Sequence, residues 1–395
     1  MKEESEIQKN KRPRRSILVF ILALFTIYGG INLYIFLKVI NSFPLGAPFS
    51  VLLALIILIM ICAPLIVRIL EGSGRESLAC LFAGTGYTWL GIVFLVFSLS
   101  LVVDIYHLLV SAAGFFLHKD LSPIVPGDKA TLASSILIAL TAMLYGYFRA
   151  TVIDAEKLLI KTPKIPKEIT TLTIVQISDI HLGLIVRKKR LARILSKVAD
   201  AAPDILISTG DLVDGQIDEL SGLAEPFQKI KPKYGKFAIT GNHEYFAGIT
   251  PALEFTEKAG FRILRGEAAT IPGLLNIAGI DDPAGDYYGR RIHIQEKDLL
   301  ANLPAHLFTL LLKHEPDVTR ESLGLFDLQL SGHTHKGQIF PFNLITRIRF
   351  PFISGYYSLE KSSSLYVSRG SGTWGPPVRL FAPPEVTVIR LLHSK

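Results

Sequence analysis

The sequence predicts an N-terminal all-α transmembrane bundle followed by a soluble α/β domain. Long apolar stretches without charge fill most of the first 150 of the 395 residues. From about residue 170, short apolar runs alternate with amphipathic segments of helical spacing. Polar side chains follow several of these runs, where the strands of an α/β sheet open onto loops. We therefore expect a transmembrane domain at 1–150, a linker at 151–170 and an α/β domain at 171–395.

Four uncharged stretches are long enough to cross about 30 Å of hydrocarbon. They are Ser16–Leu37, Phe49–Val67, Ser77–Val103 and Ala130–Phe148. Helices of a soluble core keep a polar face, which these stretches lack. The basic run before the first stretch has no clear cleavage site, so a removed signal peptide is not expected. The prediction is a multi-pass protein of the cell membrane, with about four helices in the lipid bilayer.

The distribution of Lys and Arg predicts the orientation of the chain. With four spans, the N-terminus, the loop at 68–75 and the segment after the last span share one side and carry thirteen Lys and Arg. The other side carries Lys38, Lys119 and Lys129. This bias predicts a cytoplasmic α/β domain. The segment 77–117 is too long for one simple span, and we interpret it as one span plus an interfacial helix. Two spans there would put the domain outside.

The remaining composition excludes several function classes. Asp104 could mark a transport site, although a place at the water interface is the favoured interpretation. Cys62 and Cys80 lie in or beside spans, so no disulfide framework is expected. The net charge of +8 fits the orientation bias and an anionic membrane surface. Outside residues 339–357, no basic stripe interleaves with aromatic residues as in nucleic-acid binders, and no phosphate-cradling P-loop motif is present.

In the second half, the hydrophobic pattern predicts alternating strands and helices, and hence two packed sheets flanked by helices. The expected strands are Leu172–Ser178, Asp204–Thr209, Lys236–Thr240, Leu274–Ile280, Leu307–Lys313, Leu328–Ser331, Leu365–Ser368 and Glu385–Leu392. The expected helices are Arg187–Ala202, Ile217–Ile230 and Pro251–Ala259.

Asp, Asn and His residues follow five of these strands. Gly332-His333-Thr334-His335 is the most informative, because two imidazoles in a polar turn suit metal binding better than packing. Its companions are Asp179-Ile180-His181, Gly210-Asp211, Gly241-Asn242-His243-Glu244 and His314. Together they supply enough ligands for two metal ions about 3.5–4 Å apart. Taken singly, the aspartates could cap helices and Asn242 could shape a turn.

This ordered set resembles the calcineurin-like metallophosphoesterases over roughly residues 170–395. Gly332 to Gln338 and the segment 368–375 are similar to the membrane-associated branch of that family. The resemblance implies a four-layer αββα sandwich and metal-dependent hydrolysis of a phosphoric ester. Lys336 departs from the family pattern, in which a second glycine is common after the last histidine. This departure leaves the metal ligands in place and puts in doubt only the family's contacts with phosphate or lipid.

The resemblance also implies a role for each ligand. Asp179, His181, Asp211 and His335 would hold the first divalent ion, and Asp211, Asn242, His314 and His333 the second, with Mn, Fe or Zn as the metal. A metal-activated hydroxide would then attack phosphorus without a covalent intermediate. His243 is expected to donate a proton to the leaving oxygen or to stabilise charge on the phosphoryl group. Glu244 is expected either to orient His243 or to form a salt bridge.

Residues 339–357 are aromatic, apolar and basic, and allow two interpretations. The loop could dip into the membrane surface through Phe350 and Phe352, with Arg347 and Arg349 on phosphate groups. Alternatively it is a hairpin packed on its own domain.

Arg369 and Arg379 are further candidate substrate contacts. The expected substrate is a phosphodiester, a pyrophosphate or a phosphomonoester, and the membrane tether favours a lipid-linked one. No nucleic-acid partner is expected. The alternative function is a signalling or transport protein whose phosphoesterase-like domain senses a ligand.

Overall fold

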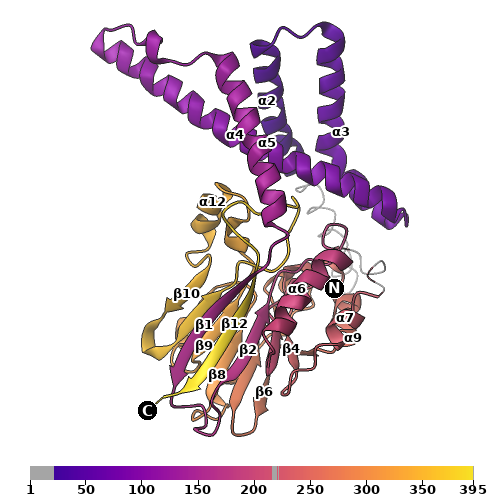
Figure 1. Ribbon diagram of the computed structural model, residues 1–395, viewed down its shortest axis with the longest axis vertical. Coiled ribbons are helices and arrows are strands. Elements are labelled where there is room, and N and C mark those ends of the chain that lie inside the picture. The colour runs from indigo at the N-terminus through magenta and orange to yellow at the C-terminus, as the bar shows by residue number, and fades with distance from the viewer. Residues whose placement is uncertain (1–21, 216–219, 221, 395) are drawn as a thin grey trace, which may run out of the picture. The chain divides into compact units, whose positions relative to one another are not determined.

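The computed structural model describes residues 22–215, 220 and 222–394, and the chain divides into two compact units, 1–144 and 145–395. The first unit is helical (Figure 1). A π-helical turn at Leu24–Tyr28 leads into α2 (Gly29–Ser42), followed by α3 (Ala47–Gly72), α4 (Glu76–Leu117) and α5 (Asp128–Arg149). A short 3-10 turn, Ser122–Ile124, precedes α5.

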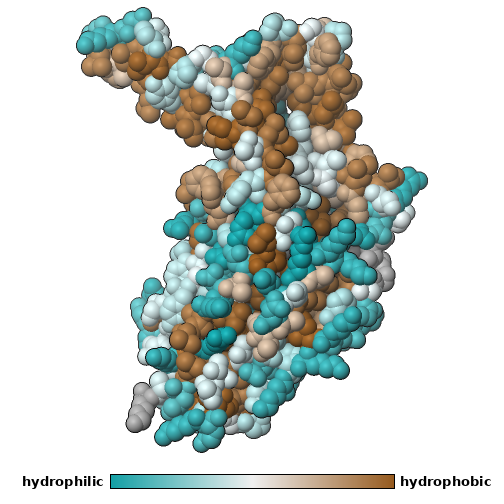
Figure 2. All heavy atoms as spheres, viewed as in Figure 1, coloured by the Kyte–Doolittle hydropathy of each residue, from teal (hydrophilic) through white to brown (hydrophobic). Residues whose placement is uncertain are grey.

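Three described segments are long and apolar enough to cross a membrane: 47–72, 76–117 and 122–149. Their surfaces are mostly hydrophobic (Figure 2). The expected first span starts at Ser16, outside the described residues, and α2 covers its later part. The α4 helix continues without a break over 42 residues, so the expected division into a span and a separate interfacial helix is not seen. Asp104 of α4 pairs with Lys38 of α2 at 2.5 Å and accepts a hydrogen bond from Tyr34.

The second unit contains two six-stranded sheets. The first has the order β1-β12-β2-β3-β4-β5 and the second β10-β11-β9-β8-β7-β6. Their bounds are β1 Asp154–Thr162, β2 Leu172–Ile177, β3 Ile205–Ser208, β4 Lys236–Ala238, β5 Arg262–Ile263, β6 Glu267–Ile271, β7 Leu275–Gly279, β8 Phe308–Leu312, β9 Leu328–Ser331, β10 Gly355–Ser358, β11 Ser364–Val367 and β12 Glu385–His393.

Every expected strand is present, and four more were missed: β1, β5, β6 and β10. The β1 strand occupies the expected linker and pairs in parallel with β12 from Asp154↔Glu385 to Thr162↔His393. The sheet therefore begins before residue 171. The expected helix Ile217–Ile230 is wrong in its described part, which contains only the short α7 (Glu225–Gln228).

The second unit is layered as predicted, with helices outside two facing sheets. Side chains from both sheets form a shared core, in which Ile174 and Ile207 of the first meet Leu310 and Leu330 of the second. The helices α6 (Lys188–Asp200) and α9 (Ile249–Lys258) pack on the outer face of the first sheet (Figure 1). The short α11 (Glu296–Ala301) packs on the outer face of the second sheet through Leu300. This arrangement is the expected αββα sandwich.

The parallel strands bring distant loops together at one edge. In the first sheet β2, β3 and β4 run parallel, and in the second β7, β8 and β9 do. Gln176 connects the two sheets near that edge, because its amide donates to Oγ1 of Thr209 and to the carbonyl of Ser331. Residues that follow these strands therefore gather between the two sheets.

Candidate metal centre

All seven predicted metal ligands lie just after the ends of strands and converge at this edge. Asp179 and His181 follow β2, and Asp211 follows β3. Asn242 begins the short helix α8 (Asn242–Ala247) after β4. His314 follows β8, and His333 and His335 follow β9.

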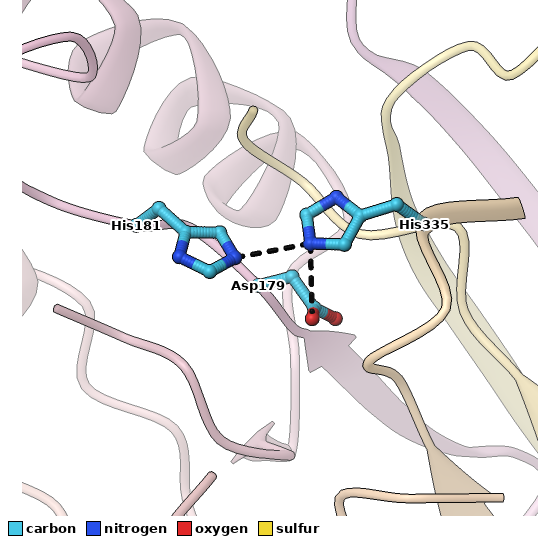
Figure 3. A group of neighbouring side chains, drawn as sticks. All are labelled: Asp179, His181 and His335. Atoms are coloured by element: carbon cyan, nitrogen blue, oxygen red, sulfur yellow. Dashed lines mark hydrogen bonds and ion pairs between the residues drawn. The ribbon is translucent and has the colours of Figure 1, made fainter. Parts of the chain in front are cut away.

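The first cluster consists of Asp179, His181 and His335 (Figure 3). Nε2 of His335 lies 3.3 Å from Oδ1 of Asp179 and 3.0 Å from Nε2 of His181. Nε2 of His181 is also 3.7 Å from Oδ2 of Asp211. Two ring nitrogens and two carboxylates thus face one small volume.

The second cluster consists of Asp211, His314 and His333, with Asn242 beside them. Oδ2 of Asp211 lies 3.1 Å from Nε2 of His314. Oδ1 of Asn242 is 3.2 Å from that nitrogen and 3.1 Å from Nδ1 of His333. Asp211 faces both clusters, which is the geometry that a bridging carboxylate needs.

The donor set and its burial fit divalent cations. Carboxylate, amide oxygen and imidazole are ligands that first-row metals share. Asp179 and Asp211 are only 0% and 2% exposed, and in the described part of the chain their ion pairs are with histidines. Buried carboxylates require compensating charge. These clusters can therefore hold metal.

The protonation states also fit metal binding, which requires ionised carboxylates and neutral imidazoles. Burial raises the pKa of Asp211, but His314 and His243 outweigh it and hold the pKa well below its usual range. Burial and His243 lower the pKa of His181 to about 3. Burial and His314 lower the pKa of His333 to about 4. His314 is the exception, because Asp211 overcomes burial and raises its pKa well above the usual value.

The backbone at the ligands is strained. Five of the seven have positive φ angles: Asp179 at 51°, His181 at 55°, Asp211 at 52°, His333 at 69° and His335 at 48°. Such conformations cost of order 1–3 kcal/mol each, and they cluster at functional sites. Strain at so many neighbouring positions indicates that the fold holds these side chains for a purpose other than packing.

His243 lies beside both clusters with a partner that the sequence analysis missed. Its Nδ1 is 2.8 Å from Oδ1 of Asp214, and its backbone N–H donates to Oδ1 of Asp211. Burial lowers the pKa of His243, but the carboxylates of Asp211 and Asp214 outweigh it and raise the pKa to about 9. The available signal was a second aspartate three residues after Asp211.

Among the residues that the structure describes, Glu244 makes neither a hydrogen bond to His243 nor a salt bridge, contrary to both expectations. Its carboxylate accepts backbone hydrogen bonds from Gly241 at 2.6 Å, Leu212 at 2.8 Å and Asp211 at 3.0 Å. Burial and the nearby Asp211 raise the pKa of Glu244 to about 7. Glu244 therefore ties the loop after β4 to the loop after β3.

The two arginines near the C-terminus make contacts within the fold, and the predicted substrate contacts of Arg369 and Arg379 stay predictions. Arg379 is 0% exposed and donates to the carbonyls of Gly372 and Arg369, and its Nη2 is 3.0 Å from Nδ1 of His335. Its position supports the His335 ring. Arg369 forms ion pairs with the buried Glu385 at 2.7 Å and with Glu156 at 3.0 Å.

The expected aromatic loop forms a helix, α12 (Phe342–Arg349), followed by β10. Phe350 is buried and packs edge-on against the His333 ring at 5.0 Å, and Phe352 packs against Tyr357. The prediction that Phe350 touches the membrane is therefore wrong. Arg349 is exposed, pairs with Glu315 at 3.5 Å and lies over the Phe350 ring. Arg347 is exposed on α12.

An αββα sandwich with histidine and aspartate clusters at the strand ends defines a metallohydrolase class, and comparison with known proteins identifies the family. Residues 172–337 match the calcineurin-like phosphoesterase family. An uncharacterized metallophosphoesterase of Aquifex aeolicus is 40% identical over 257 residues, 65% of this chain and 98% of that protein. One from Campylobacter jejuni is 30% identical over 400 residues, 96% of this chain and 99% of that protein. The chain belongs to the calcineurin-like metallophosphoesterases.

A third relative is named as a transmembrane protein. The transmembrane protein with metallophosphoesterase domain of Danio rerio is 32% identical over 283 residues, 67% of this chain and 63% of that protein. Together with the three apolar helices, this similarity indicates membrane association. The chain is thus a metal-dependent phosphoesterase associated with a membrane.

Proposed function

We propose that this enzyme hydrolyses a lipid-linked phosphodiester or pyrophosphate at the membrane surface, with two divalent ions in its centre. The observation that carries the proposal is the convergence of seven donor side chains, five of them on strained backbone, around Asp211. A phosphomonoester or a soluble nucleotide would fit the same centre, so the lipid linkage rests on further observations.

We assign two overlapping ligand sets, and the distances within the two clusters support this assignment. Asp179, His181, Asp211 and His335 would hold one ion, and Asp211, Asn242, His314 and His333 the other, with Mn, Fe or Zn suited to these donors. Bound ions of this kind neutralise phosphoryl oxygens and lower the pKa of water at the centre.

His243 is the proposed proton donor to the leaving oxygen. Asp214 holds its Nδ1, which leaves Nε2 as the nitrogen that can face a substrate. The pKa of about 9 keeps the ring protonated at neutral pH, which suits a general acid. Glu244 and Arg379 support this chemistry indirectly, by fixing the loop of Asp211 and the ring of His335.

The surroundings of His243 favour an apolar leaving group. The ring of Phe246 lies 5.1 Å and that of Trp374 6.0 Å from the His243 ring. Both side chains are about half exposed, at 51% and 53%. Phe246 and Trp374 thus form an apolar rim beside His243, the proposed proton donor. Such a rim fits a lipid alcohol or lipid phosphate as the leaving group. The Lys and Arg bias supports a cytoplasmic position for the centre.

Metal removal and one substitution test the proposal. Purified full-length protein stripped of metal should lose hydrolysis of an aryl phosphodiester, and Mn²⁺ should restore it. Asp211→Asn should abolish turnover, whereas Asp286→Asn, an aspartate on the surface with a 43% exposed side chain, should not. Full activity under strong chelation would refute the proposal. A variant Asp211→Asn that keeps its cellular phenotype without turnover would instead support the ligand-sensing alternative.

Comparison of lipid extracts identifies the substrate. Cells that contain the Asp211→Asn variant should accumulate a phosphorylated lipid that cells with the active protein lack. Accumulation of a water-soluble phosphate ester instead would contradict the lipid linkage and leave the phosphoesterase assignment in place.

A further inference from the structure

The helix α12 presents its apolar side chains to the outside instead of to a core. None of its eight residues is buried. The exposed apolar side chains on and beside it form what we call the interfacial face: Phe340 (45% exposed), Phe342 (42%), Leu344 (58%), Ile345 (54%), Ile348 (85%) and Phe381 (65%). Figure 2 shows apolar surface over this end of the second unit. A cluster of this kind marks a binding surface.

This face is continuous with the end of a candidate membrane span. The Phe340 ring packs on that of Phe381 at 5.9 Å, and the Phe340 N–H donates to the carbonyl of Leu380. One residue earlier, the N–H of Arg379 donates to the carbonyl of Gly146 in the last turns of α5. All of these residues belong to the second unit, so the end of α5 and the start of α12 are joined through the segment 378–381.

The end of α5 has the composition of a membrane interface. Tyr145, Tyr147 and Phe148 are 53%, 49% and 61% exposed there, and Arg149 follows them. Tyrosines concentrate at the level of lipid headgroups, and basic residues flank spans on the cytoplasmic side. The interfacial face therefore adjoins the level at which this chain leaves the bilayer.

The charges beside the interfacial face complement anionic lipid. Residues 336–352 contain Lys336, Arg347 and Arg349 and no Asp or Glu. Arg349 pairs with Glu315 and Asp317 outside this segment, which leaves Lys336 and Arg347 to face lipid phosphate. A short helix with exposed Phe, Leu and Ile and with basic residues is the composition of an interfacial helix that lies in the headgroup region.

We propose that the interfacial face docks on the chain's own bilayer and holds the metal centre at headgroup level. The helix is connected to the centre at both ends. At its start, Gln338 donates to the carbonyl of Trp374 and accepts from its N–H, and Trp374 adjoins His243. At its end, Phe350 packs on His333. A docked α12 lets a membrane-bound substrate present its phosphate to the centre without leaving the lipid.

A depth measurement on the full-length protein tests the docking directly. Nitroxide labels at Ile348→Cys and at a control, Leu159→Cys, are compared in vesicles of phosphatidylethanolamine and phosphatidylglycerol after Cys62 and Cys80 are replaced by serine. Leu159 is a matched control because it is 57% exposed on β1. Oxygen should relax the label at 348 more strongly than a water-soluble nickel chelate does. The chelate should relax the label at 159 more strongly than oxygen does. Equal chelate access at both positions would overturn the proposal. Spin–spin broadening at 348 would also overturn it, by showing a second copy as the occupant.

A pair of surface substitutions gives an independent readout. Burial of one isoleucine side chain contributes a factor of roughly 10 to 100 to transfer from water. Ile345→Ser with Ile348→Ser should therefore lower the hydrolysis of a vesicle-borne substrate by at least about tenfold, with an unchanged rate on a soluble aryl phosphodiester. That soluble rate reports folding and the centre itself. If the double substitution leaves the rate on the vesicle-borne substrate unchanged, or lowers the rates on both substrates by the same factor, docking is contradicted. If the unsubstituted protein hydrolyses neither substrate, the proposed function is refuted instead.

Discussion

Gly332→Ala is the substitution with the largest effect expected from the smallest change, because it adds one methyl group beside the first ligand cluster. A Cβ at this position would lie 2.0 Å from Oγ of Ser178 and 2.3 Å from Oδ2 of Asp179. Ser178 itself donates a hydrogen bond to that carboxylate. The new methyl group therefore pushes on the carboxylate of Asp179 and on the Ser178 hydroxyl that donates to it.

The structure gives the size of the displacement. Ordinary van der Waals contact for a Cβ begins at 3.4 Å, so the Asp179 carboxylate must shift by about 1 Å. Gly332 is not in the left-handed region of the backbone, so the conformation itself permits alanine. A misplacement of about 1 Å costs on the order of 10²-fold in rate, and disturbed ligand support costs about 10–100-fold in metal affinity.

The assay combines turnover of an aryl phosphodiester with competition for metal by a calibrated chelator. Gly289→Ala is the matched control. It introduces backbone strain of about 1–2 kcal/mol at φ 61°, but nothing lies within 4 Å of its Cβ. The control should lose stability and keep both metal affinity and turnover. A Gly332→Ala protein that binds metal and turns over at the unsubstituted rate would refute the geometry described for Asp179.

Three further substitutions test separate parts of the site. Asp214→Asn leaves Asp211 in place but removes the second carboxylate that raises the pKa of His243, and should lower turnover by about 10²-fold at unchanged metal content, as measured by kinetics and elemental analysis. Glu244→Gln removes one of two oxygens that accept backbone N–H groups and should cost about 1–3 kcal/mol, measured by thermal unfolding in detergent. Arg369→Met leaves the 0% exposed Glu385 without its ion-pair partner and should cost about 3–5 kcal/mol. Glu385→Gln in the same protein should recover part of that loss.

The sequence predicted the central strands well because their signals are local. Short apolar runs such as Leu328–Ser331 end in a polar, glycine-containing turn, and each of these strands is present. The β1 strand was missed because its sequence does not alternate polar and apolar residues: Glu156 and Lys157 are adjacent and three apolar residues follow them, although the burial alternates along the strand. Its partner β12 lies at the other end of the chain, so no local pattern indicates the pairing.

For the site, residue types and order predicted the candidate ligands that converge in the structure, but not the contacts that support them. The hydrogen bond that His243 donates to Asp214 joins residues 29 positions apart and exists only because β3 and β4 are neighbours. Arg379 was offered only as a candidate substrate contact, because no local pattern in the sequence indicates the backbone carbonyls and the His335 ring that surround it. The helical form of α12 was not predicted, because the sequence analysis considered residues 339–357 only as a loop at the membrane surface or as a packed hairpin.

Metal content tests the central claim most directly. Full-length protein loaded with Mn²⁺ and passed through a desalting column should retain about two ions per chain by elemental analysis, and the Asp211→Asn variant should retain fewer. Retention of no transition metal after loading with Mn, Fe or Zn would contradict the account, because the converging carboxylates and imidazoles would then have no cation to hold.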